Sequence, residues 1–344
     1  MLVLGIETSC DETALAVVED GRRVVSSSVA SSLPSHQRYG GVVPEIASRA
    51  HVELITYELE QALQKAGLRA ADIDRVAVTR GPGLSGCLVT GVAGAKALAL
   101  VSGRPLVGVN HLHAHLYAAL MDQPQWSLDA RMVGLVISGG HTALVQMNGI
   151  RSFKLLGQTR DDAVGEAFDK VAQILGLGFP GGPEIERAAK EGNPKAHRFS
   201  TPKIKSGTPF DFSLSGIKTA VLHKVRGPLQ KEQAGNGKEI SREFVQDMAA
   251  SFQASIVEEV VMKSVEACRV SRVSHLAVGG GVVANGLLRS RLQEVCADFG
   301  IEVALPPVAL CTDNGAMVAG LGFHLQPVLS RELGATPDLS VEMN

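Results

Sequence analysis

The stretch Val133-Gly-Leu-Val-Ile137-Ser-Gly-Gly-His-Thr142-Ala-Leu-Val-Gln-Met147-Asn-Gly149 decides the fold, because it repeats the pattern with which the chain begins. In both places an apolar run predicts a buried strand, a polar loop follows, and a second apolar run ends at a turn. The first copy consists of a strand at 2–6, a polar loop at 7–13, a strand at 13–18 and an Asp20-Gly21 turn. This duplication predicts two similar α/β halves with a ligand cleft between them.

Size and composition are those of a soluble globular protein with room for two domains. The chain has 344 residues, 45% of them hydrophobic, and a net charge of −2. The N-terminus lacks the basic region of a signal peptide, and the apolar run Cys87–Val101 contains Lys96 and is rich in Gly and Ala. Five cysteines without a CxxC pair argue against a disulfide framework or a thiolate zinc site. We therefore expect a cytoplasmic protein without a membrane partner.

The polar loops of the two copies suit a phosphate group. The loop Glu7–Thr13 offers side-chain oxygens, and Ser138-Gly139-Gly140 offers backbone N–H donors with no side chain in the way. The first arrangement resembles the first phosphate loop of the actin-like ATPase superfamily, which includes sugar kinases, Hsp70 and actin. An ordinary hairpin turn would explain the first loop alone, so the interpretation depends on the repeat.

Three histidines lie within five residues in Asn110-His111-Leu112-His113-Ala114-His115. On a helix His111 and His115 share one face, whereas His113 points about 200° away. The pair can share one divalent ion but needs further ligands from elsewhere. Leu112 occupies the place where a zincin peptidase has a general-base Glu, which makes a peptidase a weak alternative. The other alternative is that these histidines only hydrogen-bond to backbone at a domain junction.

Further polar groups follow the second copy. Residues 161–170 predict a helix with carboxylates at 162, 166 and 169 near one face, and a glycine-rich loop at 176–183 precedes another helix. Gly279-Gly280-Gly281 follows a predicted strand and suits a flat ligand or a phosphate, with Asn285 placed for a ribose or a base. Asp313 is either the N-cap of a helix or a hard oxygen ligand that completes the histidine site.

The segment 195–242 is strongly basic. It holds ten Lys or Arg residues and three acidic ones, a net +7, so the rest of the chain carries −9. A basic insertion in an otherwise acidic protein indicates a polyanionic partner, although a charged surface excursion explains the same numbers.

Taken together, these segments closely resemble one family, the bacterial TsaD proteins, which are tRNA N6-adenosine threonylcarbamoyltransferases. The resemblance covers essentially the whole chain. The matching stretches are Gly5–Thr13, Gly41–His51, Gly81–Ser85, His111–His115, Ser138–Thr142, Phe212–Thr219, Gly279–Asn285 and Cys311–Gly315.

The resemblance implies an actin-like (ASKHA, ribonuclease H-like) fold of two duplicated α/β domains with a cleft between them. The N-terminal domain would span 1–131, completed by a C-terminal helix at 325–344, and the C-terminal domain would span 132–324 with the basic insertion 195–242. The implied reaction transfers the threonylcarbamoyl group from threonylcarbamoyl-AMP to N6 of adenosine 37 in tRNAs that read ANN codons, with AMP as the leaving group.

The resemblance also assigns residues to ligands. His111, His115 and Asp313 would bind one divalent metal, Fe²⁺ or Zn²⁺. The adenine nucleotide would be threonylcarbamoyl-AMP, or ATP with Mg²⁺. It would be held by Val136, Ile137, Ser138, Gly139, Gly140, Asp169, Gly182, Glu186 and Asn285. Archaeal and eukaryotic relatives tend to offer the metal a tyrosine where this chain has Val136, so water or substrate would fill that position here.

The chemistry needs a polarised carbonyl, because the exocyclic amine of adenine is a poor nucleophile. A metal with open positions can act as the Lewis acid, and the glycine loops can stabilise the departing phosphate. We expect Asp11 to accept the proton or orient the substrate, with Glu12 as the second candidate. The tRNA would bind along 195–242, where Lys203, Lys205 and Lys224 are candidate contacts.

Implied partners are a TsaB-like paralogue of the N-terminal half, a TsaE-like P-loop ATPase and a TsaC-like synthase that supplies threonylcarbamoyl-AMP. The small-residue helix at 87–101 is a candidate docking face for the paralogue. Two other classes remain possible from the fold alone: a kinase for a small acceptor, and an ATP-dependent assembly factor without group transfer.

Overall fold

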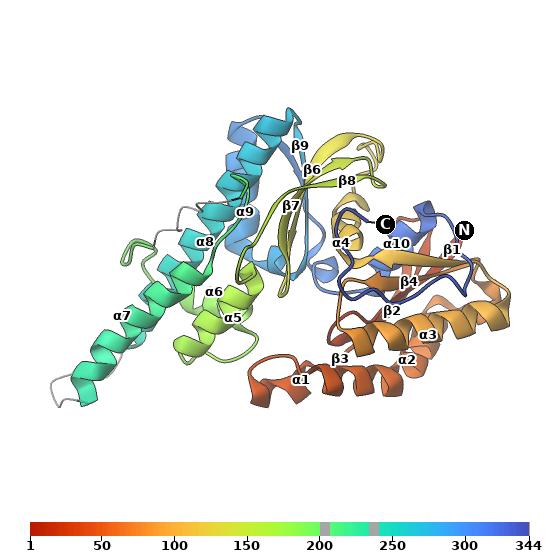
Figure 1. The fold of residues 1–344 in the computed structure, drawn as a ribbon, viewed down its shortest axis with the longest axis horizontal. Coiled ribbons are helices and arrows are strands. Elements are labelled where there is room, and N and C mark those ends of the chain that lie inside the picture. The colour runs from red at the N-terminus through yellow and green to blue at the C-terminus, as the bar shows by residue number, and fades with distance from the viewer. Residues whose placement is uncertain (200–206, 234–240, 344) are drawn as a thin grey trace.

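Two mixed five-stranded sheets of identical topology form the framework of the protein (Figure 1). The structure is a computed structural model that describes residues 1–199, 207–233 and 241–343, with only the backbone of 227–233. The first sheet has the order β3-β2-β1-β4-β5 and the second the order β10-β9-β6-β7-β8. In each sheet an antiparallel meander of three strands is extended by two parallel strands. The predicted duplication is therefore confirmed.

The strands of the first sheet are β1 (Leu2–Glu7), β2 (Glu12–Glu19), β3 (Arg23–Ser31), β4 (Arg75–Gly81) and β5 (Leu106–Asn110). Those of the second sheet are β6 (Arg131–Ile137), β7 (Thr142–Asn148), β8 (Phe153–Gln158), β9 (His275–Gly279) and β10 (Glu302–Ala304). The α-helices are α1 (Leu33–His36), α2 (Pro44–Ala66), α3 (Ser85–Ser102), α4 (His111–Leu120), α5 (Val164–Ile174), α6 (Gly181–Ala189), α7 (Ser215–Gln233), α8 (Arg242–Ser271), α9 (Gly286–Asp298) and α10 (Gly315–His324).

Strand β6 shows how the sequence builds the layers. Its side chains alternate: Met132 and Val136 face a core shared with the first sheet, whereas Val133, Leu135 and Ile137 face the core formed with α5–α9. Both sets are fully buried, which explains why this strand reads as a continuous apolar run.

Helices α4 and α10 lie in the layer between the two sheets (Figure 1). Helix α10 follows the second sheet in sequence, yet it packs on β1, β2 and β4 of the first. Close approach is possible because two strand residues lack a side chain. A Cβ at Gly5 would lie 2.2 Å from the carbonyl oxygen of Gly315, and a Cβ at Gly279 would lie 2.2 Å from that of His115. These two contacts fix helix α4, which carries two candidate metal ligands, and helix α10, which directly follows the third.

Helix α3 is the one helix of the described residues that is long and apolar enough to cross a membrane, with 33% of it buried. It packs on β4 and α2, and its buried residues Val92, Ala95 and Ala99 belong to the core of the first sheet. The core helix of a globular protein passes the same test of length and composition, so α3 needs no membrane to explain it.

The predicted helix at 325–344 is wrong. Residues 325–343 form an extended tail with turns, and α10 is the last helix of the described chain. Pro327, Gly334 and Pro337 interrupt the segment. Proline breaks a helix, and the helical conformation is also disfavoured for the residue directly before a proline. The tail binds along the first sheet instead, where Val328 pairs with Leu106. The boundary between the two domains at 131/132 stays a prediction.

Candidate active site

A cleft of about 690 Å³ lies beside the carboxyl ends of the parallel strands. Loops that follow β1, β4, β6 and β9 line it, which is where open α/β sheets bind ligands. The loops of both copies contribute, the first through 9–12 and the second through 138–141. The cleft therefore brings the two predicted phosphate loops to one place.

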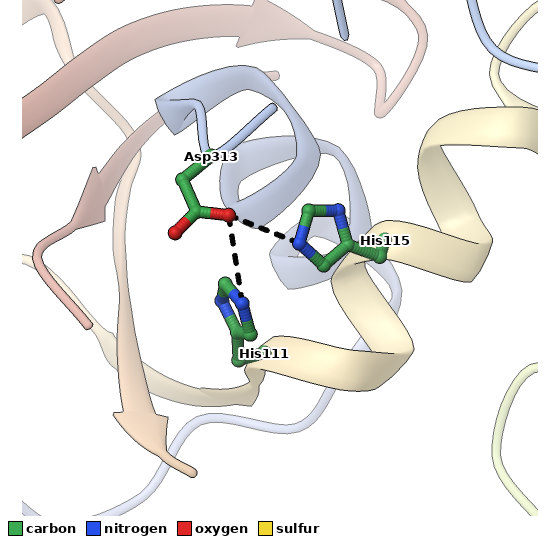
Figure 2. A group of neighbouring side chains, drawn as sticks. All are labelled: His111, His115 and Asp313. Atoms are coloured by element: carbon green, nitrogen blue, oxygen red, sulfur yellow. Dashed lines mark hydrogen bonds and ion pairs between the residues drawn. The ribbon is translucent and has the colours of Figure 1, made fainter. Parts of the chain in front are cut away.

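Three side chains converge next to this cleft: His111 and His115 of α4, and Asp313 from the turn before α10 (Figure 2). His111 and Asp313 line the cleft, and His115 is buried behind them. The His115 Nε2 atom lies 3.1 Å from Asp313 Oδ1, and the His111 Nε2 atom lies 3.6 Å from the same oxygen. Both histidines thus present Nε2 to the carboxylate, as their spacing on one helix face predicted.

Asp313 is not a helix cap. Asn314 caps α10 by accepting a hydrogen bond from the Met317 N–H at 2.8 Å. The capping alternative for Asp313 is therefore wrong, and its carboxylate contacts the two histidines instead.

The three ligands fit a divalent metal. Their candidate ligand atoms all lie within 4.8 Å of one another. The Nδ1 atom of His115 is buried with no hydrogen-bond partner among the described residues, so the ring is held by packing and by its Nε2 contact. Two imidazoles and one carboxylate with open positions are a donor set that suits Zn²⁺ or non-haem Fe²⁺.

His113 faces away from this site, as predicted. Its Nε2 donates to the carbonyl of Val341 in the C-terminal tail at 2.6 Å, and its ring stacks on Phe153 at 3.6 Å between centroids. The tail therefore supports α4 from the side opposite the metal ligands.

Glu7 is a site residue that the sequence analysis missed. It ends β1 with a side chain that is 0% exposed. One oxygen accepts from the Ser9 N–H at 2.6 Å; the other accepts from the Thr79 hydroxyl and lies 3.2 Å from His111 Nδ1. A carboxylate on the second nitrogen fixes the ring orientation of a metal-binding histidine. The available signal was a carboxylate directly at the end of an apolar strand.

The charges of neighbouring groups shift the pKa values of His111 and Asp313 in this cluster. Burial would lower the pKa of His111, but the carboxylates of Asp313 and Glu7 outweigh it and raise that pKa to about 9. Burial would likewise raise the pKa of Asp313, yet the charge of His111 lowers it to about 2. Without a bound metal, a protonated His111 therefore supplies the positive charge that faces the two carboxylates.

Glu12 and His141 respond to the same environment in opposite ways. Burial, with Asp313 and Asp11 nearby, raises the pKa of Glu12 to about 9. Burial and the charge of His111 lower the pKa of His141 to about 4. At neutral pH Glu12 is protonated and His141 is neutral, so neither adds charge to the cleft.

The second predicted phosphate loop lines the same cleft. A Cβ at Gly139 or Gly140 would meet nothing within 4 Å, so the backbone there is open to a ligand. Asp169 lies beside it and accepts from the Gly181 N–H at 2.6 Å. Lys170 also lines the cleft and pairs with Asp162 and Glu166 at 2.6 and 2.7 Å. Three carboxylates, at 162, 166 and 169, were predicted to lie on one helix. Residues 166 and 169 lie on α5, but Asp162 precedes it, so the prediction was wrong for Asp162.

Other predicted ligands lie outside the lining of the cleft. Val136 and Ile137 are buried on opposite faces of β6, so only their backbone could approach a nucleotide. Gly182 lies in the first turn of α6, where a Cβ would meet nothing within 4 Å. Glu186 accepts from the Gly286 N–H at 2.9 Å. Asn285 caps α9 through Leu288 and donates to Gln253 at 2.8 Å.

The predicted tRNA contacts are only partly described. Lys203 and Lys205 lie outside the described residues, whereas Lys224 is exposed on α7 with its ammonium 5.9 Å from the Phe199 ring centroid. Lys218 of the same helix is paired with Asp162 at 2.9 Å, so part of the positive charge of this segment is already neutralised.

Solved structures of other proteins share the fold. HypF of T. kodakarensis matches with a TM-score of 0.61 at 16% identity, over 94% of this chain and 47% of that one. The activator of 2-hydroxyisocaproyl-CoA dehydratase from Clostridium difficile, solved with bound ADPNP, matches with a TM-score of 0.51 at 16% identity, over 94% and 95% of the two chains. At such identities these likenesses show the fold alone, and the predicted actin-like ASKHA fold is confirmed.

Sequence relatives are much closer. The tRNA N6-adenosine threonylcarbamoyltransferase of Symbiobacterium thermophilum is 47% identical over 99% of this chain and 97% of its own. That of Geobacillus thermodenitrificans is 50% identical over 93% and 90%. The profile of the family described as "TsaD: tRNA N6-adenosine threonylcarbamoyltransferase" matches residues 23–320. The chain therefore belongs to the TsaD family, the acyltransferases that form N6-threonylcarbamoyladenosine in tRNA.

Proposed function

We propose that the cleft is where the threonylcarbamoyl group passes from threonylcarbamoyl-AMP to N6 of adenosine 37 in ANN-decoding tRNAs. The observation that supports it most is the convergence of His111, His115 and Asp313 beside the open Gly139-Gly140 backbone. A group that can polarise a carbonyl and a group that can hold a phosphate then lie in one cleft.

The reaction balances without a further reactant. The lone pair of N6 attacks the carbamoyl carbon, the bond from that carbon to the phosphate oxygen breaks, and AMP leaves with the electron pair. The backbone N–H groups of Gly139 and Gly140 are suited to the phosphate, because fixed donors stabilise developing negative charge. Asp169 and Asn285 are the proposed contacts of the adenosine part, together with Gly182 and Glu186 of α6.

His111, His115 and Asp313 would hold one Zn²⁺ or Fe²⁺ ion. When bound, the ion supplies a Lewis acid for the carbamoyl oxygen. Glu7 holds the His111 ring so that Nε2 faces Asp313, and Asn110 caps α4 by accepting from the Leu112 N–H at 3.0 Å. The protein therefore orients the ligands before the substrate arrives.

Asp11 is the proposed acceptor of the N6 proton. It lines the cleft one residue before Glu12, whose raised pKa keeps it protonated at neutral pH. A protonated carboxyl cannot accept the proton, which supports Asp11 as the first candidate.

The proposed tRNA surface is the basic segment 195–242 next to α7. The proposed protein partners are a TsaB-like paralogue docked on α3, where Val89 is 57% and Val101 87% exposed, and a TsaE-like ATPase. A TsaC-like enzyme would supply the adenylate in the same cytoplasmic compartment.

The test of the reaction is single-turnover transfer. Metal-loaded protein, with its partners, is given radiolabelled threonylcarbamoyl-AMP and an ANN-decoding tRNA. We expect label at adenosine 37, and a loss of roughly a hundredfold or more in His111→Ala, because a ligand of the Lewis acid is gone. Label that persists in His111→Ala would remove the histidine site from the reaction. ATP cleavage with phosphorylation of a small acceptor, and no transfer, would favour a kinase.

Glu7→Gln tests the orientation of His111. An amide keeps the shape but presents no anion to Nδ1, so we expect metal affinity to fall roughly 10- to 100-fold. Zinc competition with a chromophoric chelator measures this without any assay of activity. Glu58→Gln is the matched control, because Glu58 is also a buried glutamate, 4% exposed on α2 and outside the cleft lining. Equal losses in both variants would contradict the role of Glu7.

Asp11→Asn tests the proton acceptor. The variant keeps the size and loses the basicity, so we expect single-turnover transfer to slow by roughly 10²- to 10⁴-fold with adenylate binding unchanged. Glu12→Gln should slow transfer much less, since Glu12 is already neutral at neutral pH. Unchanged transfer in Asp11→Asn would exclude the residue.

Neutralising Lys203, Lys205 and Lys224 together tests the tRNA surface. Each lost phosphate contact reduces the slope of log affinity against log salt by about 0.7 to 0.9, so three contacts lower it by roughly two. Binding of tRNA measured across a salt series gives the slope. An unchanged slope would exclude these lysines from the interface.

A further inference from the structure

The loop between β3 and α2 is exposed at its tip but anchored by a buried histidine. It contains the short helix α1 and a 3-10 turn, Gln37–Tyr39, that ends at Gly40 with φ of 70°. His36 is 0% exposed inside it. Its Nδ1 accepts from the Val43 N–H at 3.3 Å and its Nε2 lies 3.0 Å from the Ser32 hydroxyl. Both ends of the loop are therefore tied to one ring.

The anchor continues to the catalytic loop. The Ser32 hydroxyl donates to the carbonyl of Asp11 at 3.0 Å, and the Ser32 N–H donates to the same oxygen at 2.9 Å. The position of the loop tip is thus fixed relative to the proposed proton acceptor. Such a connection gives the tip a defined place at the cleft although it lies on the surface.

Tyr39 forms this tip together with Arg38. Its side chain is 54% exposed, and the Arg38 guanidinium lies 4.7 Å from the ring centroid. The next residues, 40–42, line the cleft, and a Cβ on Gly40 would lie 3.8 Å from the amide nitrogen of Gln173 in α5. Tyr39 therefore directly precedes the part of the loop that lines the cleft and faces α5.

An exposed aromatic ring at this place is unusual for the chain. Only 4% of its residues are aromatic, and the exposed ones in the described part of the chain are Tyr39, Tyr57 and Phe299. Of these three, only Tyr39 adjoins residues that line the cleft. Its neighbours Gln37, Arg38, Gly40 and Gly41 are polar or small, which disfavours an apolar protein interface and favours a charged, planar ligand.

We propose that Tyr39, backed by Arg38, is a stacking platform for the nucleotide next to the target adenosine in the tRNA loop. The inference rests on the proposed function, because the adenine must leave its stack to bring N6 into the cleft. Its neighbour then loses a stacking partner. Single-stranded RNA bases stack on exposed aromatic rings and on arginine planes, and Arg38 adds a positive charge beside the phosphates.

The test places 2-aminopurine next to the target adenosine in an anticodon stem-loop RNA. Its fluorescence falls when it stacks on an aromatic ring. With the full chain and its partners, we expect quenching on binding to the wild type and to Tyr39→Phe, and none with Tyr39→Ala. Affinity for the RNA should fall roughly five- to hundredfold in Tyr39→Ala and be rescued in Tyr39→Phe.

Phe299→Ala is the matched control. Phe299 is also exposed, 48%, and also lies under an arginine, with Arg269 5.8 Å from its centroid, but it is not part of the cleft lining. This variant should bind the RNA like the wild type.

Transfer kinetics separate the platform from the chemistry: Tyr39→Ala should raise KM for the RNA and leave kcat within about twofold of wild type at saturating RNA.

Three results would overturn the inference. They are wild-type RNA affinity in Tyr39→Ala, a loss of kcat with unchanged KM, and weakened assembly with a protein partner while RNA binding stays intact. A failure of the proposed function is distinguishable, because it would show as transfer that persists in His111→Ala whatever Tyr39 does.

Discussion

The structure depends on two helices that lie unusually close to two sheets. Helices α4 and α10 fill the layer between the sheets, and each touches a strand where a glycine leaves room for helix backbone, Gly279 for α4 and Gly5 for α10. An added Cβ would overlap a carbonyl oxygen at either place, so the helices could not keep their present position. Because α4 carries His111 and His115 and α10 follows Asp313, the packing of the whole protein sets the distance between the metal ligands.

Charge is the second constraint on the site. Glu7 and Asp313 are carboxylates that face His111 from two sides, and together they favour a positive charge on or beside that ring. A proton satisfies this preference in the free protein, and a metal ion can replace it after the ring has lost the proton. Glu12 avoids adding a further negative charge because its pKa is raised. The cleft thus carries less negative charge than the number of carboxylates around it suggests.

Much of the fold and the metal site could be predicted from the sequence, because local patterns encode them. The repeated strand–loop–strand pattern predicted the two sheets, and the four-residue spacing of His111 and His115 predicted a shared helix face. Asp313 entered as one of two alternatives, and only the capping bond of Asn314 decided between them. Glu7 was missed because its role depends on a ring 104 residues away. The tail at 325–343 was misread because its partners lie on β4, β5 and α4. No sequence pattern singled out Tyr39, because its proposed role depends on the cleft beside it.

The separation of the ligands along the chain has a consequence for biogenesis. His111 and His115 are synthesised early, and Asp313 emerges only after both sheets have been made, since it follows β10. A partly translated chain can therefore offer a metal ion only two imidazoles, which bind it weakly and without a fixed geometry. All three candidate ligands can therefore act together only after α10 has packed on the first sheet.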